Sequence, residues 1–206
     1  MDKLIVLVNN AKGMGQHQMT SRLKYYLEEK GYRVKEICEE DNWQVITNKI
    51  GKKRILGIIL SGSDIRITKK TNLKMYKNSI TALIKYPNVP VLGICFGMQI
   101  MSVVYGSNLS SLVKPIIGIK KVHTKKGVLF QKSVRGYRVY ENHYDMVNYS
   151  PVGFKTTAIN SCGYIEAIEN VAALRFGVQF HPEYHPTRFG CKVIDNFIKF
   201  CHNMSS

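Results

Sequence analysis

Apolar runs and amphipathic segments alternate along the first half of the chain. Continuous apolar runs, typical of strands buried on both faces, occupy residues 4–8, 55–60 and 89–94. Residues 17–30 repeat apolar side chains at steps of three and four, which predicts a helix that ends at Gly31. A further helix is predicted over about 71–85, and residues 32–37 alternate as a half-buried strand. Strands that alternate with helices predict parallel β-α-β units in a doubly wound sheet.

The second half of the chain has a different pattern. Short β-prone segments separated by turn residues follow one another at 116–122, 137–140, 154–159, 164–169 and 173–180. They predict antiparallel hairpins beside the parallel sheet, and the apolar face of residues 186–202 predicts a closing helix. We therefore expect a single α/β domain over residues 1–206. Its sheet would be doubly wound, mostly parallel and flanked by helices, with antiparallel β-hairpins in the second half.

Composition narrows the class of protein. The chain has 206 residues, of which 45% are hydrophobic, enough to bury a sizeable core. No apolar run approaches the roughly 20 residues of a membrane-spanning helix, and the run at 4–8 is too short for a signal peptide. We therefore expect a soluble, cytoplasmic protein with no membrane partner.

The formal net charge of +16 at pH 7 raises the question of a nucleic-acid partner. Most of the basic residues are lysines spread from Lys3 to Lys199, and the short clusters at 52–54 and 120–126 contain no aromatic side chains. Specific recognition of nucleic acid relies on arginine forks and stacked aromatic rings. We therefore expect no specific nucleic-acid partner.

Five cysteines are scattered along the chain without a C-x-x-C pair, which indicates neither a disulfide framework nor a thiolate zinc site. Cys95 follows the buried run at 89–94 and stands between Gly93 and Gly97, where a helical pattern starts. A nucleophile on a strand-to-helix turn needs small neighbours, and the helix N-terminus favours a thiolate there. The same spacing also fits a structural cysteine in a tight turn, so a catalytic site needs a base as well.

A candidate base follows the last β-prone segment. Pro182 keeps His181 extended, so the side chains of His181 and Glu183 share a face, and Glu183 would orient one imidazole nitrogen while the other serves Cys95. A surface histidine beside a carboxylate is an alternative, and a cation held by His181, Glu183 and His185 is another. We expect no metal and no other cofactor, because a catalytic zinc site usually has three ligands with a defined second shell.

Together the two motifs resemble the Cys-His-Glu triad of the class I glutamine amidotransferases. The motifs read Gly-Ile-Cys-Phe-Gly-Met-Gln over residues 93–99 and Gly-Val-Gln-Phe-His-Pro-Glu over residues 177–183, and their order and separation match the family. Similarity also covers 60–63, 142–145 and the tail after Glu183, with most likeness to the glutaminase part of the GMP synthases. The resemblance implies the flavodoxin-like fold of this family.

The resemblance also implies a reaction. Cys95 would attack the side-chain amide of L-glutamine and form a γ-glutamyl thioester, with His181 as acid and base and Glu183 orienting it. The ammonia would pass to a separate ATP-dependent synthetase, since this chain has no ATP motif. The oxyanion hole would consist of Phe96, Gly62 and Ser63, and the amino-acid end of glutamine would be bound by Gln99, Asn142, His143, Tyr144 and Asp145.

Two positions depart from the family pattern. Ser63 stands where the family usually has a second glycine, and Tyr144 stands where GMP-synthase-like chains often have a glycine. A positive φ at Ser63 would strain the oxyanion loop, and Tyr144 would reshape the glutamine pocket. Two alternative functions therefore stay open: hydrolysis of another γ-glutamyl compound, and a binding or regulatory module with a weakened site.

Overall fold

A computed structural model describes residues 4–12, 14–43, 48, 50, 55–67, 73–184 and 188–205. Its strands are β1 (Leu4–Asn9), β2 (Arg33–Cys38), β3 (Ile55–Leu60), β4 (Val91–Ile94), β5 (Leu109–Thr124), β6 (Val134–Val147), β7 (Lys155–Asn160), β8 (Ile165–Asn170) and β9 (Arg175–Val178). Its helices are α1 (Met14–Glu29), the 3-10 turn η2 (Leu73–Tyr76), α3 (Lys77–Lys85), α4 (Phe96–Val104) and α5 (Arg188–Ser205).

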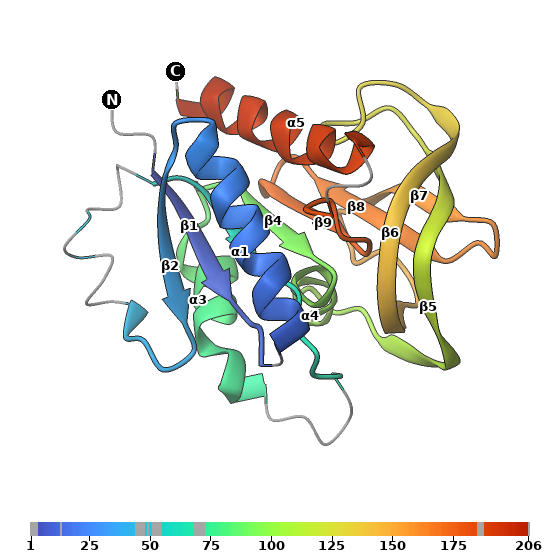
Figure 1. The fold of residues 1–206 in the computed structure, drawn as a ribbon, viewed down its shortest axis with the longest axis horizontal. Helices are drawn as coiled ribbons and strands as arrows, with labels where there is room; N and C mark the ends of the chain where they lie inside the picture. The colour runs from blue at the N-terminus through green and yellow to red at the C-terminus, as the bar shows by residue number, and fades with distance from the viewer. Residues whose placement is uncertain are drawn as a thin grey trace.

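The described strands form one sheet in the order β2-β1-β3-β4-β9-β8-β7-β5-β6 (Figure 1). The pairs from β2 to β9 are parallel, and those from β9 through β8, β7 and β5 to β6 are antiparallel. This confirms the predicted fold, a parallel first half with antiparallel strands in the second. Because β9 is parallel to β4 and antiparallel to β8, it joins the two parts of the sheet.

Alternating side chains of the central strands bury a core on each face of the sheet. Ile5 and Leu7 of β1 pack with α1 and α5, whereas Leu4, Val6 and Val8 pack with α3 and α4. In Figure 1, α1 and α5 accordingly lie on the near side of the parallel strands. Strands covered on both faces must be apolar throughout, which is why β1 and β3 read as unbroken hydrophobic runs.

The largest differences from the predicted elements lie in β5 and β6. The prediction located only the most β-prone parts of these strands, at 116–122 and 137–140, because both are long and exposed along much of their length. Gly118 and Gly136 have φ of 92° and 78° and interrupt the alternation with a conformation that L-residues rarely adopt. Periodicity is therefore weak over these strands even though they form a continuous ribbon.

The predicted helices differ from the observed ones mainly at their ends. The predicted helix over 71–85 begins with the 3-10 turn η2, and its residues 71 and 72 lie outside the described part of the chain. Helix α5 extends to Ser205, beyond the predicted end at 202, and residues 186 and 187 of that prediction also lie outside the described part. The described helices include none with the length and apolar character that a bilayer crossing requires.

Candidate active site

Cys95 occupies a strained turn between β4 and α4. Its backbone has φ 50° and ψ −104°, an unusual conformation for a residue with a side chain, at a cost of about 1–3 kcal/mol. The turn is held because the Cys95 N–H donates to Val178 O at 2.8 Å and Cys95 O accepts from the Gln99 N–H at 3.0 Å. The strain forms the sharp strand-to-helix elbow that directs a nucleophile away from the sheet.

The glycines on either side of Cys95 are required by close backbone packing. A Cβ on Gly93 would lie 2.5 Å from Gly97 O, and a Cβ on Gly97 would collide with Leu60 O. No real Cβ makes contacts this short with backbone atoms, so α4 could not lie against β4 and β3 with larger residues at either position. The sequence spacing G-x-C-x-G therefore has a steric cause in the fold.

His181 reaches Cys95 because β4 and β9 are adjacent parallel strands. Gly93 pairs with Gly177 and Ile94 pairs with Val178, so the residues after both strands emerge at the same edge of the sheet. The fully buried His181 is anchored there by its N–H, which donates to Tyr140 O at 2.8 Å. Two motifs far apart in the sequence thus form one site.

Glu183 holds the imidazole of His181 in a defined orientation. His181 Nδ1 lies 2.8 Å from Glu183 Oε1, and both side chains are buried. Burial by itself lowers the pKa of His181, but the negative charges of Glu183 and Cys95 outweigh it and hold that pKa well above 6.5. The arrangement therefore favours the imidazolium form of His181 beside Cys95.

Gln179 is a site residue that the sequence prediction missed. Its Nε2 lies 3.6 Å from Cys95 Sγ, and its Oε1 accepts from Gln99 Nε2 at 3.3 Å. Gln99 Nε2 also donates to Asp145 O at 3.0 Å, so these amides link the nucleophile to β6. The available signal was spacing: Gln179 lies two residues before His181 on an extended chain and so faces the same side.

A cavity of about 130 Å³ opens in front of Cys95. Of the predicted site residues, it brings together Cys95, Ser63, Gln99 and the segment 142–145; its other lining residues are Asp64, Ile65 and Arg66. The buried His181 and Glu183 do not line it. Phe96 and Gly62 do not line it either, and the Phe96 ring packs against Tyr76 with 4.6 Å between centroids. The oxyanion role predicted for Phe96 and Gly62 therefore rests on their backbone N–H groups. At the start of α4, the first backbone N–H groups have no acceptor within the helix.

The loop after β3 is anchored without strain at Ser63. Asn10 N–H donates to Ser61 Oγ at 2.9 Å, and Asn10 Nδ2 donates to Ser61 O at 3.0 Å. Among the described non-glycine residues, only Cys95 and Leu174 have positive φ. The positive φ considered for Ser63 is therefore absent, and the strain lies at Cys95 instead.

Segment 142–145 alternates because it belongs to strand β6. His143 and Asp145 are buried, whereas Asn142 and Tyr144 are exposed, the latter with 44% of its surface accessible. The Tyr144 ring lies at the rim of the cavity, 5.0 Å from the Arg66 guanidinium. Tyr144 thus places an aromatic ring beside the cavity that was expected to bind glutamine.

Behind the cavity, Glu141, His143 and Glu166 form a buried cluster whose ligand-type atoms lie within 4.8 Å of one another, close enough to converge on a cation. His143 Nδ1 is 3.0 Å from Asp145 O and therefore donates to it, which leaves Nε2 sharing a proton with Glu141 Oε2 at 3.0 Å. Burial, and then the charge of Glu141, raises the pKa of Glu166 well above its usual value. His185, considered for a different cation site, lies outside the described residues.

Glu166→Gln is expected to raise the melting temperature at pH 8 by about 2–4 °C, for a gain of about 1 kcal/mol. The raised pKa means that ionising Glu166 in the folded state costs free energy at pH values above the ordinary glutamate pKa, and glutamine removes this penalty. Near pH 4 both states hold the proton, so the gain disappears. Calorimetry at both pH values tests this, with Glu29→Gln at an exposed position as control; an equal shift at pH 4 contradicts it.

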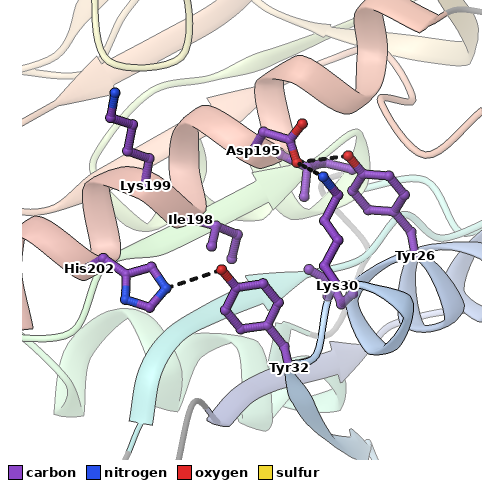
Figure 2. A pocket seen from close by; sticks show the side chains of 9 residues that line it. Tyr26, Lys30, Tyr32, Asp195, Ile198, Lys199 and His202 are labelled. Atoms are coloured by element: carbon purple, nitrogen blue, oxygen red, sulfur yellow. Dashed lines mark hydrogen bonds and ion pairs between the residues drawn. The ribbon is translucent and has the colours of Figure 1, made fainter. Parts of the chain in front are cut away.

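A second cavity, of about 470 Å³, lies between α1 and α5, away from Cys95. Figure 2 shows Tyr26 and Lys30 both pointing toward Asp195, and Tyr32 pointing toward His202. These contacts are 2.7 Å, 2.9 Å and 3.1 Å long. Tyr26, Lys30 and Tyr32 thus bond to Asp195 and His202 of α5, and these contacts hold α5 against α1 and the residues that follow it.

Comparison with known proteins gives a consistent result. The sequence model of the family "Glutamine amidotransferase class-I" matches residues 15–200. The glutamine-hydrolysing GMP synthase subunit of Methanocaldococcus jannaschii is 29% identical over 96% of this chain and 97% of its own length. The corresponding subunit of Methanococcus vannielii is 32% identical over the same shares. A crystal structure of a Thermoplasma acidophilum protein, described as a GMP synthase subunit, shares the fold with TM-score 0.76 and 24% identity, covering 97% of this chain and 94% of its own.

Proposed function

This chain belongs to the class I glutamine amidotransferases, and from that membership we propose that it hydrolyses L-glutamine to glutamate and ammonia with Cys95 as the nucleophile. The observation that carries the assignment is the positive-φ elbow at Cys95 next to a buried His181 that Glu183 orients. A structural cysteine in a tight turn would not need an imidazole with a raised pKa beside it.

In the first half of the reaction, the Cys95 thiolate attacks the side-chain carbonyl carbon of glutamine. The oxyanion that develops is stabilised by the Phe96 N–H at the start of α4 and by N–H groups of the Gly62–Ser63 loop. The His181 imidazolium donates its proton to the departing nitrogen, and ammonia leaves as the tetrahedral intermediate collapses to a γ-glutamyl thioester.

In the second half, neutral His181 takes a proton from water, whose oxygen attacks the thioester. Collapse of this intermediate expels the Cys95 thiolate and releases glutamate, and His181 is again an imidazolium. Glu183 stays ionised throughout and stabilises the positive ring, as the third member of a triad does. Gln179, with its Nε2 near Cys95 Sγ, is suited to stabilise the thiolate between turnovers.

The ammonia passes, in this proposal, to a separate ATP-dependent synthetase that makes GMP, which places the chain in purine biosynthesis. Support comes from the two archaeal relatives, each of which is named as one subunit of a GMP synthase and aligns over 97% of its length. The net charge of +16 favours an acidic docking face on that partner. All five cysteines are free, in keeping with a reducing, cytoplasmic location.

Ammonia release from glutamine, measured with and without the synthetase of the same organism and its substrates, tests this function. We expect slow release by the lone chain. Docking of the partner should turn one N–H of the Gly62–Ser63 loop toward the oxyanion, which is worth about a 10²–10³-fold increase. Activation should weaken as salt rises, because association between oppositely charged surfaces is screened. Absence of ammonia release from glutamine in both conditions would contradict the proposal.

A further inference from the structure

The cavity in front of Cys95 contains an ion pair whose arginine, Arg66, has no role assigned so far. Arg66, from the loop after β3, donates from Nη2 to Asp145 Oδ1 at 2.9 Å and from Nε to Oδ1 and Oδ2 at 3.2 Å and 3.3 Å. Both residues line the same cavity as Cys95. An anion and a cation thus stand side by side where the proposed substrate must place its amino-acid end.

The two partners of this ion pair are held very differently. Asp145 lies on β6 with 3% of its side chain exposed, and Ser111 Oγ donates to its Oδ1 at 2.6 Å. Arg66 lies on a loop, has 43% of its side chain exposed and lies over the Tyr144 ring. Asp145 is therefore the fixed partner, and Arg66 is the one that can swing without unpacking the core.

The chemistry of the pair matches the head group of a free α-amino acid. Glutamine carries an ammonium and a carboxylate on one carbon, and an aspartate beside an arginine presents the complementary charges. We propose that Asp145 accepts the α-ammonium of glutamine while Arg66 turns its guanidinium fork to the α-carboxylate, so that the ion pair opens and closes again around the substrate. This inference rests on the proposed function and names Arg66 as a binding residue for it.

Exchange of partners explains why a nearly buried charge is tolerated in the substrate-free protein. When glutamine binds, its ammonium takes the place of the guanidinium beside Asp145, so this carboxylate keeps a cationic partner in both states. A guanidinium also suits the carboxylate better than an ammonium would, because its planar fork bonds both oxygens. The cavity would accordingly prefer free glutamine to a glutamine residue within a peptide, whose α-groups are amides.

Two glutamine analogues separate the contributions of the pair. Glutaramate carries the carboxylate without the ammonium, and 4-aminobutanamide carries the ammonium without the carboxylate. Calorimetric binding is measured to Cys95→Ala protein, which cannot turn the ligand over. Arg66→Ala should weaken glutamine and glutaramate about 10- to 100-fold and leave 4-aminobutanamide nearly unchanged, whereas Asp145→Asn should weaken glutamine and 4-aminobutanamide and spare glutaramate.

Further variants keep this test independent of folding and of catalysis. Arg135→Ala removes the same charge from an exposed position on β6 and should change none of the affinities. Arg66→Lys should restore part of the carboxylate affinity, because it keeps the charge but loses the fork. Equal weakening of all three ligands by Arg66→Ala, or no binding of glutamine to folded Cys95→Ala protein, overturns the inference. If the three ligands show the predicted pattern of affinities but the wild-type protein, which retains Cys95, releases no ammonia, the proposed function alone is overturned.

Discussion

Cys95→Ala is expected to lower kcat for ammonia release from glutamine by about 10⁴–10⁶-fold, the loss seen when a triad nucleophile is removed. The reason is that no other described cysteine lines the cavity that Gln99 and Asp145 share with Cys95. Alanine keeps the Cβ, so the strained turn and its hydrogen bonds to Val178 and Gln99 persist. Released ammonia is measured in a coupled assay, and unchanged thermal melting checks that the variant is folded.

Covalent labelling gives an independent measure of the same prediction. Cys162 is exposed and Cys95 is buried, so a small general thiol reagent should modify Cys162 first. A chloroketone analogue of glutamine should instead modify Cys95 alone, because only that thiol lies in a cavity with groups for the amino-acid end. Mass spectrometry of the digested protein identifies the site. Labelling of Cys162 or Cys191 with Cys95 untouched would show that the nucleophile is misassigned.

His181→Asn is expected to reduce kcat by about 10³–10⁵-fold while leaving glutamine binding largely intact. Without the imidazole, nothing protonates the leaving nitrogen, and the Cys95 thiolate loses its counter-ion. The folded protein should survive the change, because asparagine fills much of the space and can donate to Glu183. Single-turnover thioester formation, followed by rapid quench, separates this chemical defect from a binding defect; near-native turnover would disprove the triad.

Glu183→Gln should have a smaller effect on rate and a distinct effect on its pH profile. Glu183 and Cys95 hold the pKa of His181 well above 6.5, so the wild-type protein should lose the imidazolium, and with it activity, only as pH rises through that raised value. Removing the carboxylate charge leaves burial, which lowers the pKa, so the alkaline limb should move to lower pH. The pH profile of kcat, measured for both proteins, tests this; an unmoved limb would exclude the charge of Glu183 as the source of the raised pKa.

The fold class could be predicted from the sequence because the patterns that indicate it are local. An unbroken apolar run such as 55–60 requires a strand covered on both faces, and β3 has those bounds. Gly93 and Gly97 could also be recognised in the sequence, because the backbones approach so closely there that no larger residue fits. The bounds of β5 and β6 were underestimated because exposed strands do not need regular alternation.

Candidate site residues could be predicted from the sequence only where they belong to a short motif of chemically reactive residues. Cys95, His181 and Glu183 belong to two such motifs, and the structure brings the three together as expected, although their catalytic roles stay predictions. Gln179 lay within a motif without being recognised, because its amide acquires a function only beside Cys95. Arg66 belongs to no motif. An arginine in a loop has no recognisable function in the sequence, and only the fold brings it beside Asp145 of β6.

By itself, then, the sequence determined the order of strands and helices, the elbow around Cys95 and the pairing of His181 with Glu183, because each depends on residues within a few positions of one another. Only the tertiary structure decided that β9 lies beside β4, which brings His181 to Cys95. It also decided that Arg66 forms an ion pair with Asp145. These arrangements join segments far apart in the chain, whose register is set by packing of the whole sheet rather than by any local pattern. The strain at Cys95 is of the same kind, because a backbone with φ 50° persists only where the surrounding strands and helix hold it there.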